Sequence, residues 1–489
     1  MHEDQQDHNV AVSHLELVLC VMTKWISLIL KRFIQQTIDL NSCIPLETTY
    51  PLDYLSYHEL DKLFGMHIAI VSGEYPPRWG GIGSVVFHLA GHFVQLGHEV
   101  TIITRSHSEK VPSQEGVSVV PVRWARLPMA FTRSYGKSAM KALKKLHANK
   151  PIDVINAHLP LVSWKRKEFR WLQKNIAPVV SCLHGSWLGE KEGVKRAAEA
   201  RESATWRNPN DLAILTTAGW YSQYERAGIL ESSICVSNSQ STLKEFRQWY
   251  RPDENFDCEV ILWGCDHNVF RPPNMDAEAE QLEHERIRTQ YGCGDEEALS
   301  YSSETNTPML LAVGRLVARK GYMTLLRAMP EIISHHPGAK LVIVGRGHMK
   351  SSLEKNARKL GVSESIHIQS SLSFDELAQH FRSADLVVYP SYYEGQGLIP
   401  LESLASGTPV ATVDQEPLTE MIDSSVGGLF KRGVPSDLSR CVIEMLSSDE
   451  TAEKARLGRE RVLSNYTYEH NASDYIAVFE RAIKKSVDA

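Results

Sequence analysis

Two carboxylates, Glu394 and Glu402, mark the strongest chemical motif of this 489-residue chain. Glu394 opens a Glu-Gly-Gln-Gly segment, and Glu402 lies in the apolar helix expected to begin at Leu398. Glycines let a backbone approach a ligand, and free N–H groups at a helix N-terminus bind phosphate. Carboxylates instead accept hydrogen bonds from hydroxyl groups. The segment therefore predicts a ligand that carries both groups, as a nucleotide sugar does. The alternative is a loop glutamate near an ordinary helix glutamate.

A pair of cations, Arg315 and Lys320, follows a short apolar run at 309–313. The forked guanidinium of arginine and the point charge of lysine suit a diphosphate, and both would stabilise the charge of a departing nucleotide. For a single pair of cations, a solvated basic loop is the alternative. Because the acidic segment also follows an expected strand in the same half of the chain, we favour a phosphate site.

Strands and helices alternate from Met66 onward, and this order places loops at the edge of a parallel sheet. A β-branched run at 67–72 predicts a buried strand, which a glycine-rich turn at 80–83 and a helix at 85–96 follow. With a strand at 100–104 they form a βαβ unit. Further strands in this half are expected at 154–156, 179–182 and 234–237.

A second alternating series starts near Pro308. Its expected strands are 309–313, 340–344, 366–368, 386–389 and 409–412, and its expected helices are 323–329, 374–381 and 398–405. Two separate series predict an α/β protein with two Rossmann-like, doubly wound domains. Residues 272–306, which contain acidic runs, are expected to form a surface insertion.

Taken together, these motifs resemble the retaining glycosyltransferases of family four, which have the GT-B fold. The likeness rests on the two glutamates, the Arg315/Lys320 pair, the turn at 80–83 and a Ser-Gly-Thr-Pro-Val segment at 406–410. It covers the chain from Met66 onward and implies two Rossmann-like domains that face a cleft. The implied parts are an N-terminal extension at 1–65, an acceptor domain at 66–265, a nucleotide-sugar domain at 266–465 and a helix at 466–489 that crosses back to the first domain.

The resemblance also implies roles for single residues around a nucleotide-sugar donor. Glu394 would contact the sugar hydroxyls, and Glu402 would hold the ribose hydroxyls. Arg315 and Lys320 would hold the diphosphate, helped by backbone groups. The glycines and backbone positions implied near the phosphates or the donor are Gly81, Gly83, Gly345, Gly397 and Leu398.

His184 follows a Ser-Cys-Leu run and matches the active-site histidine of the family, near the reacting sugar. The resemblance therefore implies that His184, Glu394, Arg315 and Lys320 are the catalytic residues. Gln396 departs from the family pattern, because members usually carry an aromatic side chain at this position. The departure bears on the fit around the donor sugar.

The sequence offers no protein nucleophile for a retaining reaction. The resemblance implies a front-face displacement, in which the leaving phosphate helps to deprotonate the acceptor. The chain has no Asp-x-Asp segment, the diphosphate–metal signature of the other large glycosyltransferase fold. Arg315 and Lys320 can replace the charge of a metal, so we predict that transfer requires neither a metal ion nor another cofactor.

Other functions of the same fold stay open, namely a glycogen-synthase-like polymerase and a nucleotide-sugar epimerase. The turn at 80–83 lacks the lysine that starch and glycogen synthases usually carry just before it, which disfavours the polymerase. A non-catalytic nucleotide-sugar binder is the alternative from another class, and the intact charged residues argue against it. We therefore expect a transferase that moves a hexose to a hydroxyl of a glycan, a lipid or a small molecule.

Composition bears on partners and compartment. The 53 basic and 59 acidic side chains give a net charge of −6, which disfavours a nucleic-acid partner. Eight cysteines without a Cys-x-x-Cys pair fit a reducing cytoplasm, where we expect the protein. No run of 18 apolar residues occurs, and the apolar stretch at 15–30 suggests either an interfacial helix or, as we favour, an appendage without a defined role.

Two basic stretches in the acceptor half, 133–150 and 164–171, suit anionic lipid headgroups. The first holds six cations and no acid, and the second interleaves aromatic and basic residues between Trp164 and Trp171. A solvated helix face is the commoner meaning of such runs. Peripheral contact with the cytoplasmic face of a membrane is therefore a secondary expectation.

Overall fold

The structure of the chain is a computed structural model that describes residues 65–76, 80–109, 111–127, 129–203, 208–294, 307–370 and 372–488. All of these residues belong to one unit, which begins at Lys62. The N-terminal extension expected at 1–65, with its apolar stretch at 15–30, lies outside the described residues apart from Gly65.

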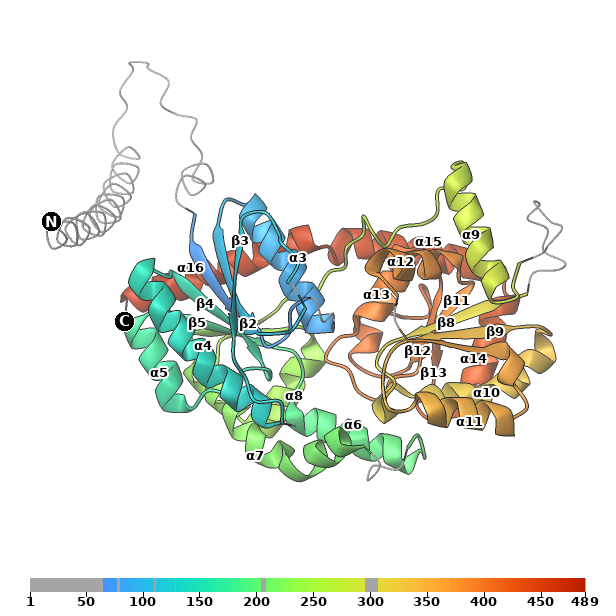
Figure 1. Cartoon of the computed structure of the whole chain (residues 1–489), viewed down its shortest axis with the longest axis horizontal. Coiled ribbons are helices and arrows are strands. Elements are labelled where there is room, and N and C mark those ends of the chain that lie inside the picture. Colours follow the sequence, from blue (N-terminus) through green and yellow to red (C-terminus); the bar gives the residue numbers. More distant parts are fainter. Residues whose placement is uncertain are drawn as a thin grey trace, which may run out of the picture. The chain divides into compact units, whose positions relative to one another are not determined.

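The first sheet is parallel and, within the described residues, has seven strands in the order β3-β2-β1-β4-β5-β6-β7 (Figure 1). The strands are β1 His67–Val71, β2 Glu99–Arg105, β3 Val117–Val122, β4 Val154–Leu159, β5 Val179–Leu183, β6 Ile234–Ser237 and β7 Cys258–Val260. The central strands are short apolar runs with both faces buried, as a sheet between two helical layers requires. The strand order reverses at β1 and β4, and ligands usually bind at the carboxyl ends beside such a reversal.

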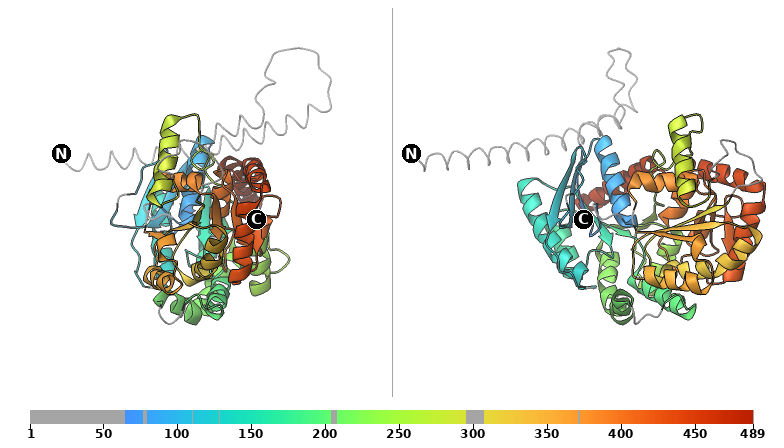
Figure 2. Two further views of the ribbon diagram at one scale, coloured as in Figure 1. Left: turned by 90° about the vertical axis from the view of Figure 1, so that its right-hand side faces the viewer. Right: turned by 45° about the vertical axis from the view of Figure 1, so that its right-hand side comes forward.

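Two hydrophobic cores cover the two faces of the first sheet. One core holds α3 (Gly81–Gln95), and the other holds α4 (Ala130–Asn149) and α5 (Arg166–Asn175). Figure 2 shows α3 in blue on one side of this sheet and the teal helices on the other. The remaining helices of this half are α6 Trp187–Glu199, α7 Pro209–Glu231 and α8 Gln240–Tyr250.

The second sheet is also parallel and, among the described residues, has six strands in the order β10-β9-β8-β11-β12-β13. The strands are β8 Met309–Val313, β9 Lys340–Val344, β10 Ile366–Gln369, β11 Leu386–Tyr389, β12 Val410–Val413 and β13 Gly428–Phe430. The helices are α10 Tyr322–His335, α11 Lys350–Lys359, α12 Phe374–Ser383, α13 Leu398–Ala405, α14 Pro435–Ser447 and α15 Glu450–Asn465, with a 3₁₀ turn η2 at Ala318–Lys320. The order reverses at β8 and β11. This arrangement confirms an α/β protein with two Rossmann-like, doubly wound sheets.

The last helix, α16 (Tyr468–Asp488), packs against α3 and against β4 and β5 of the first sheet (Figure 1). Its Tyr475 and Phe479 are buried. Their ring centroids lie 6.3 and 5.6 Å from that of Phe93 in α3. This helix, which follows the second sheet along the chain, thus contributes to the core of the first domain.

The glycine-rich turn expected at 80–83 is partly helical. The N–H of Ser84 donates to the carbonyl of Gly80 at 2.9 Å, so α3 begins at Gly81 and not near Val85. The glycines at 80, 81 and 83, which the sequence predicted to form a turn, therefore form the N-cap and first turn of the helix. Their N–H groups point from a helix N-terminus, which is a site for anions.

The surface insertion expected at 272–306 contains a packed helix, α9 (Glu278–Gln290), which lies against α12 (Figure 1). Its Ile287 is buried in the core of the second domain. Its Arg288 pairs with Asp385 at 2.8 Å, just before β11. Most of the described segment is exposed or half-buried, as a surface insertion should be, but the acidic composition gave no sign of the inner face formed by Ile287 and Arg288.

The two basic stretches form much of α4 and α5, but they are less exposed than the sequence suggested. Trp164 is fully buried, and Arg133 pairs with Glu168 at 2.5 Å. Trp171 remains 36% exposed, with the Lys144 ammonium 3.9 Å from its ring centroid. Among the described residues, no helix is both long and apolar enough to cross a membrane.

Candidate functional site

A buried ion pair joins the two loops that flank the reversal of the second sheet. Lys320 ends the turn after β8, and its Nζ contacts Oε1 of Glu394, which follows β11. The Tyr389 hydroxyl lies 2.8 Å from the Lys320 Nζ and donates to Glu394 at 2.7 Å. The Ser391 hydroxyl also donates to Glu394, at 2.5 Å. The carboxylate is thereby held by three side chains from two loops.

Burial and charge act together on this pair, whose side chains are only 11% and 12% exposed. Burial lowers the pKa of Lys320 to about 8, against the opposing charge of Glu394. Burial also opposes ionisation of Glu394, but Lys320 and Arg319 hold its pKa below the ordinary value. Both groups are charged at neutral pH, so Lys320 is a cation that Glu394 neutralises and that an incoming anion could bind in its place.

The two arginines of the same loop point to different partners. Arg319 is buried and pairs with Glu190 of α6 at 3.0 Å, so it links the two domains. Arg315 is exposed two residues after β8. Its charge adds to the lowering of the Lys320 pKa, and it partly opposes the rise that burial causes in the pKa of Glu74. The structure therefore brings the predicted pair Arg315 and Lys320 into one electrostatic environment.

Glu402 is a buried carboxyl without a hydrogen-bond partner for Oε2 among the described residues. It lies in α13, whose preceding residue Gly397 has a φ of +101°, a backbone conformation that favours glycine. Burial raises the pKa of Glu402 to about 8. A buried polar group without a partner is costly unless a ligand satisfies it. Ligand hydroxyls would do so.

The start of α3 faces the start of α13. A Cβ added to Gly81 would lie 3.9 Å from Cδ1 of Leu398, so the glycine turn and the donor loop approach each other. A Cβ added to Gly83 would lie 3.2 Å from Cγ of Glu74, so this carboxyl packs against the glycine turn. The Gly83 backbone also partly opposes the rise that burial causes in the pKa of Glu74.

Glu74 is a residue that the sequence analysis missed. Burial raises its pKa, and Arg315 and Arg105 partly oppose this effect. It follows β1 at the reversal of the first sheet, and a charged residue at that edge was the available signal.

Gly345 lies beside the Arg315 loop. A Cβ at Gly345 would collide with the carbonyl oxygen of Gly314, so the glycine is needed for two backbones to pack. This packing role is independent of the donor contact that the resemblance implied. Gly345 packs directly against Gly314, the residue that precedes Arg315.

His184 follows β5 and meets the donor loop from the first domain. A Cβ at Gly395 would collide with the His184 carbonyl oxygen, which shows how closely the two loops pack. Ser239 and Thr242 donate to the Gly395 carbonyl at 2.6 and 3.0 Å. The indole ring of Trp263 has its centroid 4.7 Å from that of His184. The structure thus brings His184 to the loop that carries Glu394.

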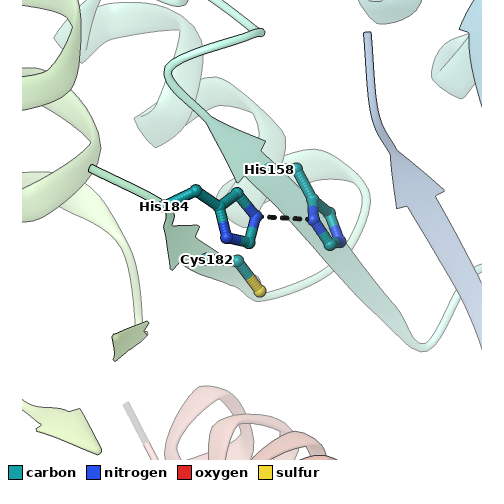
Figure 3. A group of neighbouring side chains, drawn as sticks. All are labelled: His158, Cys182 and His184. Carbon is teal, nitrogen blue, oxygen red and sulfur yellow. Dashed lines mark hydrogen bonds between the residues drawn. The ribbon is translucent and has the colours of Figure 1, made fainter. Parts of the chain in front are cut away.

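Three potential metal ligands, His158, Cys182 and His184, lie within 4.8 Å of one another (Figure 3). The two imidazoles already share a hydrogen bond, with His158 Nδ1 2.8 Å from His184 Nε2. Burial raises the pKa of the Cys182 thiol to about 11, which disfavours the thiolate that a metal would bind. A hydrogen-bonded cluster is therefore the better description of these residues.

The contacts of Gln396 give a structural reason for the amide at a position where the family usually has an aromatic side chain. Its Nε2 donates to the Trp263 carbonyl at 3.0 Å, and its Oε1 accepts from the Trp263 N–H at 2.7 Å. The side chain is 1% exposed. The amide thereby ties the donor loop to the segment between the two sheets, which an aromatic side chain cannot do by hydrogen bonds.

Replacing Gln396 by phenylalanine should lower the free energy of unfolding by about 2–4 kcal/mol, because both backbone groups of Trp263 would be buried without partners. Gln396→Glu keeps the acceptor for the Trp263 N–H but loses the amide donor to the Trp263 carbonyl, so it should also destabilise the chain, and more at high pH, where the buried carboxyl ionises. Urea unfolding measures both variants. An unchanged free energy of unfolding in the phenylalanine variant would show that the two hydrogen bonds between Gln396 and Trp263 do not stabilise the chain.

Two family models match the chain, one over each sheet. The model described as Glycosyltransferase Family 4 matches residues 79–268, and the model described as Glycosyl transferases group 1 matches residues 295–459. The chain belongs to the family-four, group 1 glycosyltransferases. The first match contains Gly81 and His184, and the second contains Lys320, Glu394 and Glu402 of this glycosyltransferase.

Curated relatives of this glycosyltransferase match over most of their length. An uncharacterized glycosyltransferase of Methanocaldococcus jannaschii is 28% identical over 431 residues, which is 86% of this chain and 99% of that protein. A glycogen synthase of Mycobacterium tuberculosis is 28% identical over 439 residues, 85% of this chain and 94% of the relative.

Solved structures share the fold. Sucrose-phosphate synthase of Thermosynechococcus elongatus superposes with a TM-score of 0.69 at 19% identity, covering 86% of this chain and all of that one (100%). HepE of Anabaena, solved in complex with UDP-glucose, gives a TM-score of 0.60 at 16% identity, with coverage of 84% and 100%. These likenesses support the GT-B fold.

Proposed function

We propose that this glycosyltransferase moves a hexose from a nucleoside-diphosphate sugar to a hydroxyl acceptor, with retention of configuration and without a metal ion. One observation carries the proposal: the buried pair Lys320–Glu394 and the unpartnered Glu402 flank the reversal of the second sheet. A diphosphate with a sugar on one side and a ribose on the other would satisfy all three groups.

In this proposal, the chain's residues bind and orient the reactants. Lys320 and the exposed Arg315 take the charge of the diphosphate, which releases Glu394 to accept hydrogen bonds from sugar hydroxyls. The acceptor oxygen attacks the anomeric carbon from the face that the phosphate leaves. The new glycosidic bond forms as the sugar–phosphate bond breaks, and the acceptor proton passes to a phosphate oxygen. The two cations stand in for the charge of a metal.

A polymerase that extends a glucan is a second candidate. The observation that favours it is the relative named glycogen synthase, which matches 85% of this chain. Incubation with a glucan and with small hydroxyl acceptors separates the two functions. A ladder of glucan lengths would support the polymerase, and a single addition would support the transferase.

A thermal-shift screen with UDP-, GDP- and ADP-sugars, each with and without EDTA, tests the donor site. A ligand that binds only the folded chain raises the melting temperature, by an amount set by its concentration relative to its Kd. We expect a shift with one nucleotide class that EDTA leaves unchanged. Nucleotide release with an acceptor, and the anomeric coupling constant of the product, then test transfer and retention.

The outcomes separate the alternatives. A shift without any transfer to a range of acceptors would favour a non-catalytic nucleotide-sugar binder. A shift that EDTA abolishes would contradict metal independence. No shift with any nucleotide would contradict the donor site.

We further propose a cytoplasmic protein that contacts anionic membranes through α4. The six cysteines within the described residues are all free, which fits a reducing compartment. Exposed lysines line α4 at Lys137, Lys141 and Lys145, and Trp171 lies beside Lys144. An exposed indole between cations suits a lipid headgroup region.

Replacing Lys137, Lys141 and Lys145 by glutamate should weaken binding to phosphatidylglycerol vesicles by roughly a hundredfold, at about 1 kcal/mol per lysine. Vesicle sedimentation at low and high salt measures it. A matched triple variant of exposed cations on α11, Lys355, Arg358 and Lys359, should bind as the wild type does. Equal loss in both variants would contradict a specific membrane face.

A further inference from the structure

A chain of hydrogen bonds lies behind His184. Its Nε2 is 2.8 Å from His158 Nδ1 (Figure 3), and His158 Nε2 is 2.8 Å from Asn156 Oδ1. The remaining ring nitrogen of His184, Nδ1, is buried and has no hydrogen-bond partner among the described residues. The unpartnered atom is therefore the open end of a continuous path.

The register of two neighbouring strands builds this path. Asn156 and His158 are two residues apart on β4 and so share one face of the sheet. On β5, Val180 pairs with Asn156 and Cys182 pairs with His158. The parallel register thus delivers all of these groups to one place.

The direction of each hydrogen bond follows from the Val180 carbonyl, which can only accept. The Asn156 amide nitrogen donates to this carbonyl at 3.4 Å and to Cys182 Sγ at 3.1 Å, so its oxygen faces His158. An amide oxygen also only accepts. His158 Nε2 must therefore carry a proton.

Both imidazoles are neutral, so each carries a single proton. Burial lowers the pKa of His158 to about 3, and burial together with His158 lowers that of His184 well below its ordinary value. With its proton on Nε2, His158 presents a bare Nδ1 that can only accept. His184 must donate its Nε2–H to it, which leaves Nδ1 of His184 as a lone pair.

We propose that Asn156 and His158 are positioning residues that fix His184 as the Nε2–H tautomer, so that its bare Nδ1 accepts a hydrogen bond from a hydroxyl of the bound sugar. The tautomer follows from the hydrogen bonds alone, whereas the sugar hydroxyl rests on the proposed function. The Trp263 ring on His184 restricts the imidazole further. A sugar hydroxyl would satisfy the buried Nδ1.

The tautomer can be measured directly on the full chain without ligand. Two-bond proton–nitrogen correlation NMR of protein labelled with ¹⁵N-histidine distinguishes a protonated from a bare ring nitrogen, and the loss of one signal set in His184→Gln assigns it. We expect a protonated Nε2 and a bare Nδ1. The reverse pattern would overturn the proposal whether or not the chain binds a nucleotide sugar.

Variants of His158 and Asn156 test the consequence for transfer. Asn156→Asp should reverse the tautomer, since a carboxylate lets His158 hold two protons and donate to His184. We expect kcat/KM to fall about 10- to 100-fold, the worth of a hydrogen bond to a buried group. His158→Asn places an amide oxygen where His158 Nδ1 lies, so it can still accept from His184 Nε2 and should retain most activity. His158→Phe has no acceptor there and should lose it.

A purely structural role would give a different result. In that case, the loss of activity in each His158 variant would follow the decrease in its melting temperature, and the tautomer of His184 would be unchanged. Metal analysis of the purified protein tests the other use of these ligands. A stoichiometric metal ion that is lost in Cys182→Ser would overturn the proposal, because a metal bound by the ring nitrogens would replace the hydrogen bond between His158 and His184.

Discussion

Replacing Lys320 by methionine should lower kcat/KM for transfer by about a hundredfold to a thousandfold, the usual cost of removing one group that stabilises developing charge. It should also lower the free energy of unfolding by about 3–5 kcal/mol, because Glu394 would be left as a buried charge without its counter-ion. Steady-state kinetics and urea unfolding measure the two effects on one preparation.

The double variant Lys320→Met/Glu394→Gln separates these effects. Removing both charges should restore most of the stability, since neither group is left unpaired. It should not restore transfer, because the diphosphate has still lost its cation. Lys350→Met, a matched change after β9, where the lysine lies 3.3 Å from the Ser370 hydroxyl, should change neither quantity measurably. Recovery of activity in the double variant would show that Lys320 acts only through Glu394.

The second sheet was predictable because each of its central strands is a short apolar run with turn residues at both ends. The edge strands β3, β7 and β13 were missed. β3 and β7 are partly exposed, which weakens their apolar pattern, and β7 and β13 have only three residues each. The inner face of α9 was missed for a related reason. One apolar residue and one arginine face the core there, within an otherwise acidic helix.

Pairing between distant residues could not be predicted from one sequence. Lys320 and Glu394 were each singled out from their local motifs, but their contact spans 74 residues and depends on the order of β8 and β11. The clamp of Gln396 on Trp263 spans 133 residues. The chain of hydrogen bonds from Asn156 to His184 depends on the register of β4 and β5, which the spacing of residues within one strand does not reveal.

Replacing Glu402 by glutamine should stabilise the chain at alkaline pH. The folded-state pKa of Glu402 is raised to about 8 from 4.5, so the folded chain binds this proton more tightly than the unfolded chain. The wild type therefore loses stability as the pH rises through this window, whereas the variant does not. The difference should grow from near zero at pH 4.5 to roughly 2–4 kcal/mol above pH 8. Urea unfolding at pH 5, 6.5 and 8 measures it.

The same substitution should weaken nucleotide binding, and a matched control shows whether the two effects share a cause. Ribose hydroxyls donate to a carboxylate, so binding to the wild type should release a proton, and the ratio of wild-type to variant affinity should rise from pH 6.5 to 8. At pH 8 we expect about 10-fold to 100-fold weaker binding in Glu402→Gln. Glu225 in α7 also has a pKa raised to about 8 by burial, but it is bound by the N–H of Trp187 and the Tyr250 hydroxyl. Glu225→Gln should change stability with pH in the same direction and leave nucleotide affinity unchanged. Equal loss of affinity in both variants would mean that Glu402 acts through stability and not through the ribose.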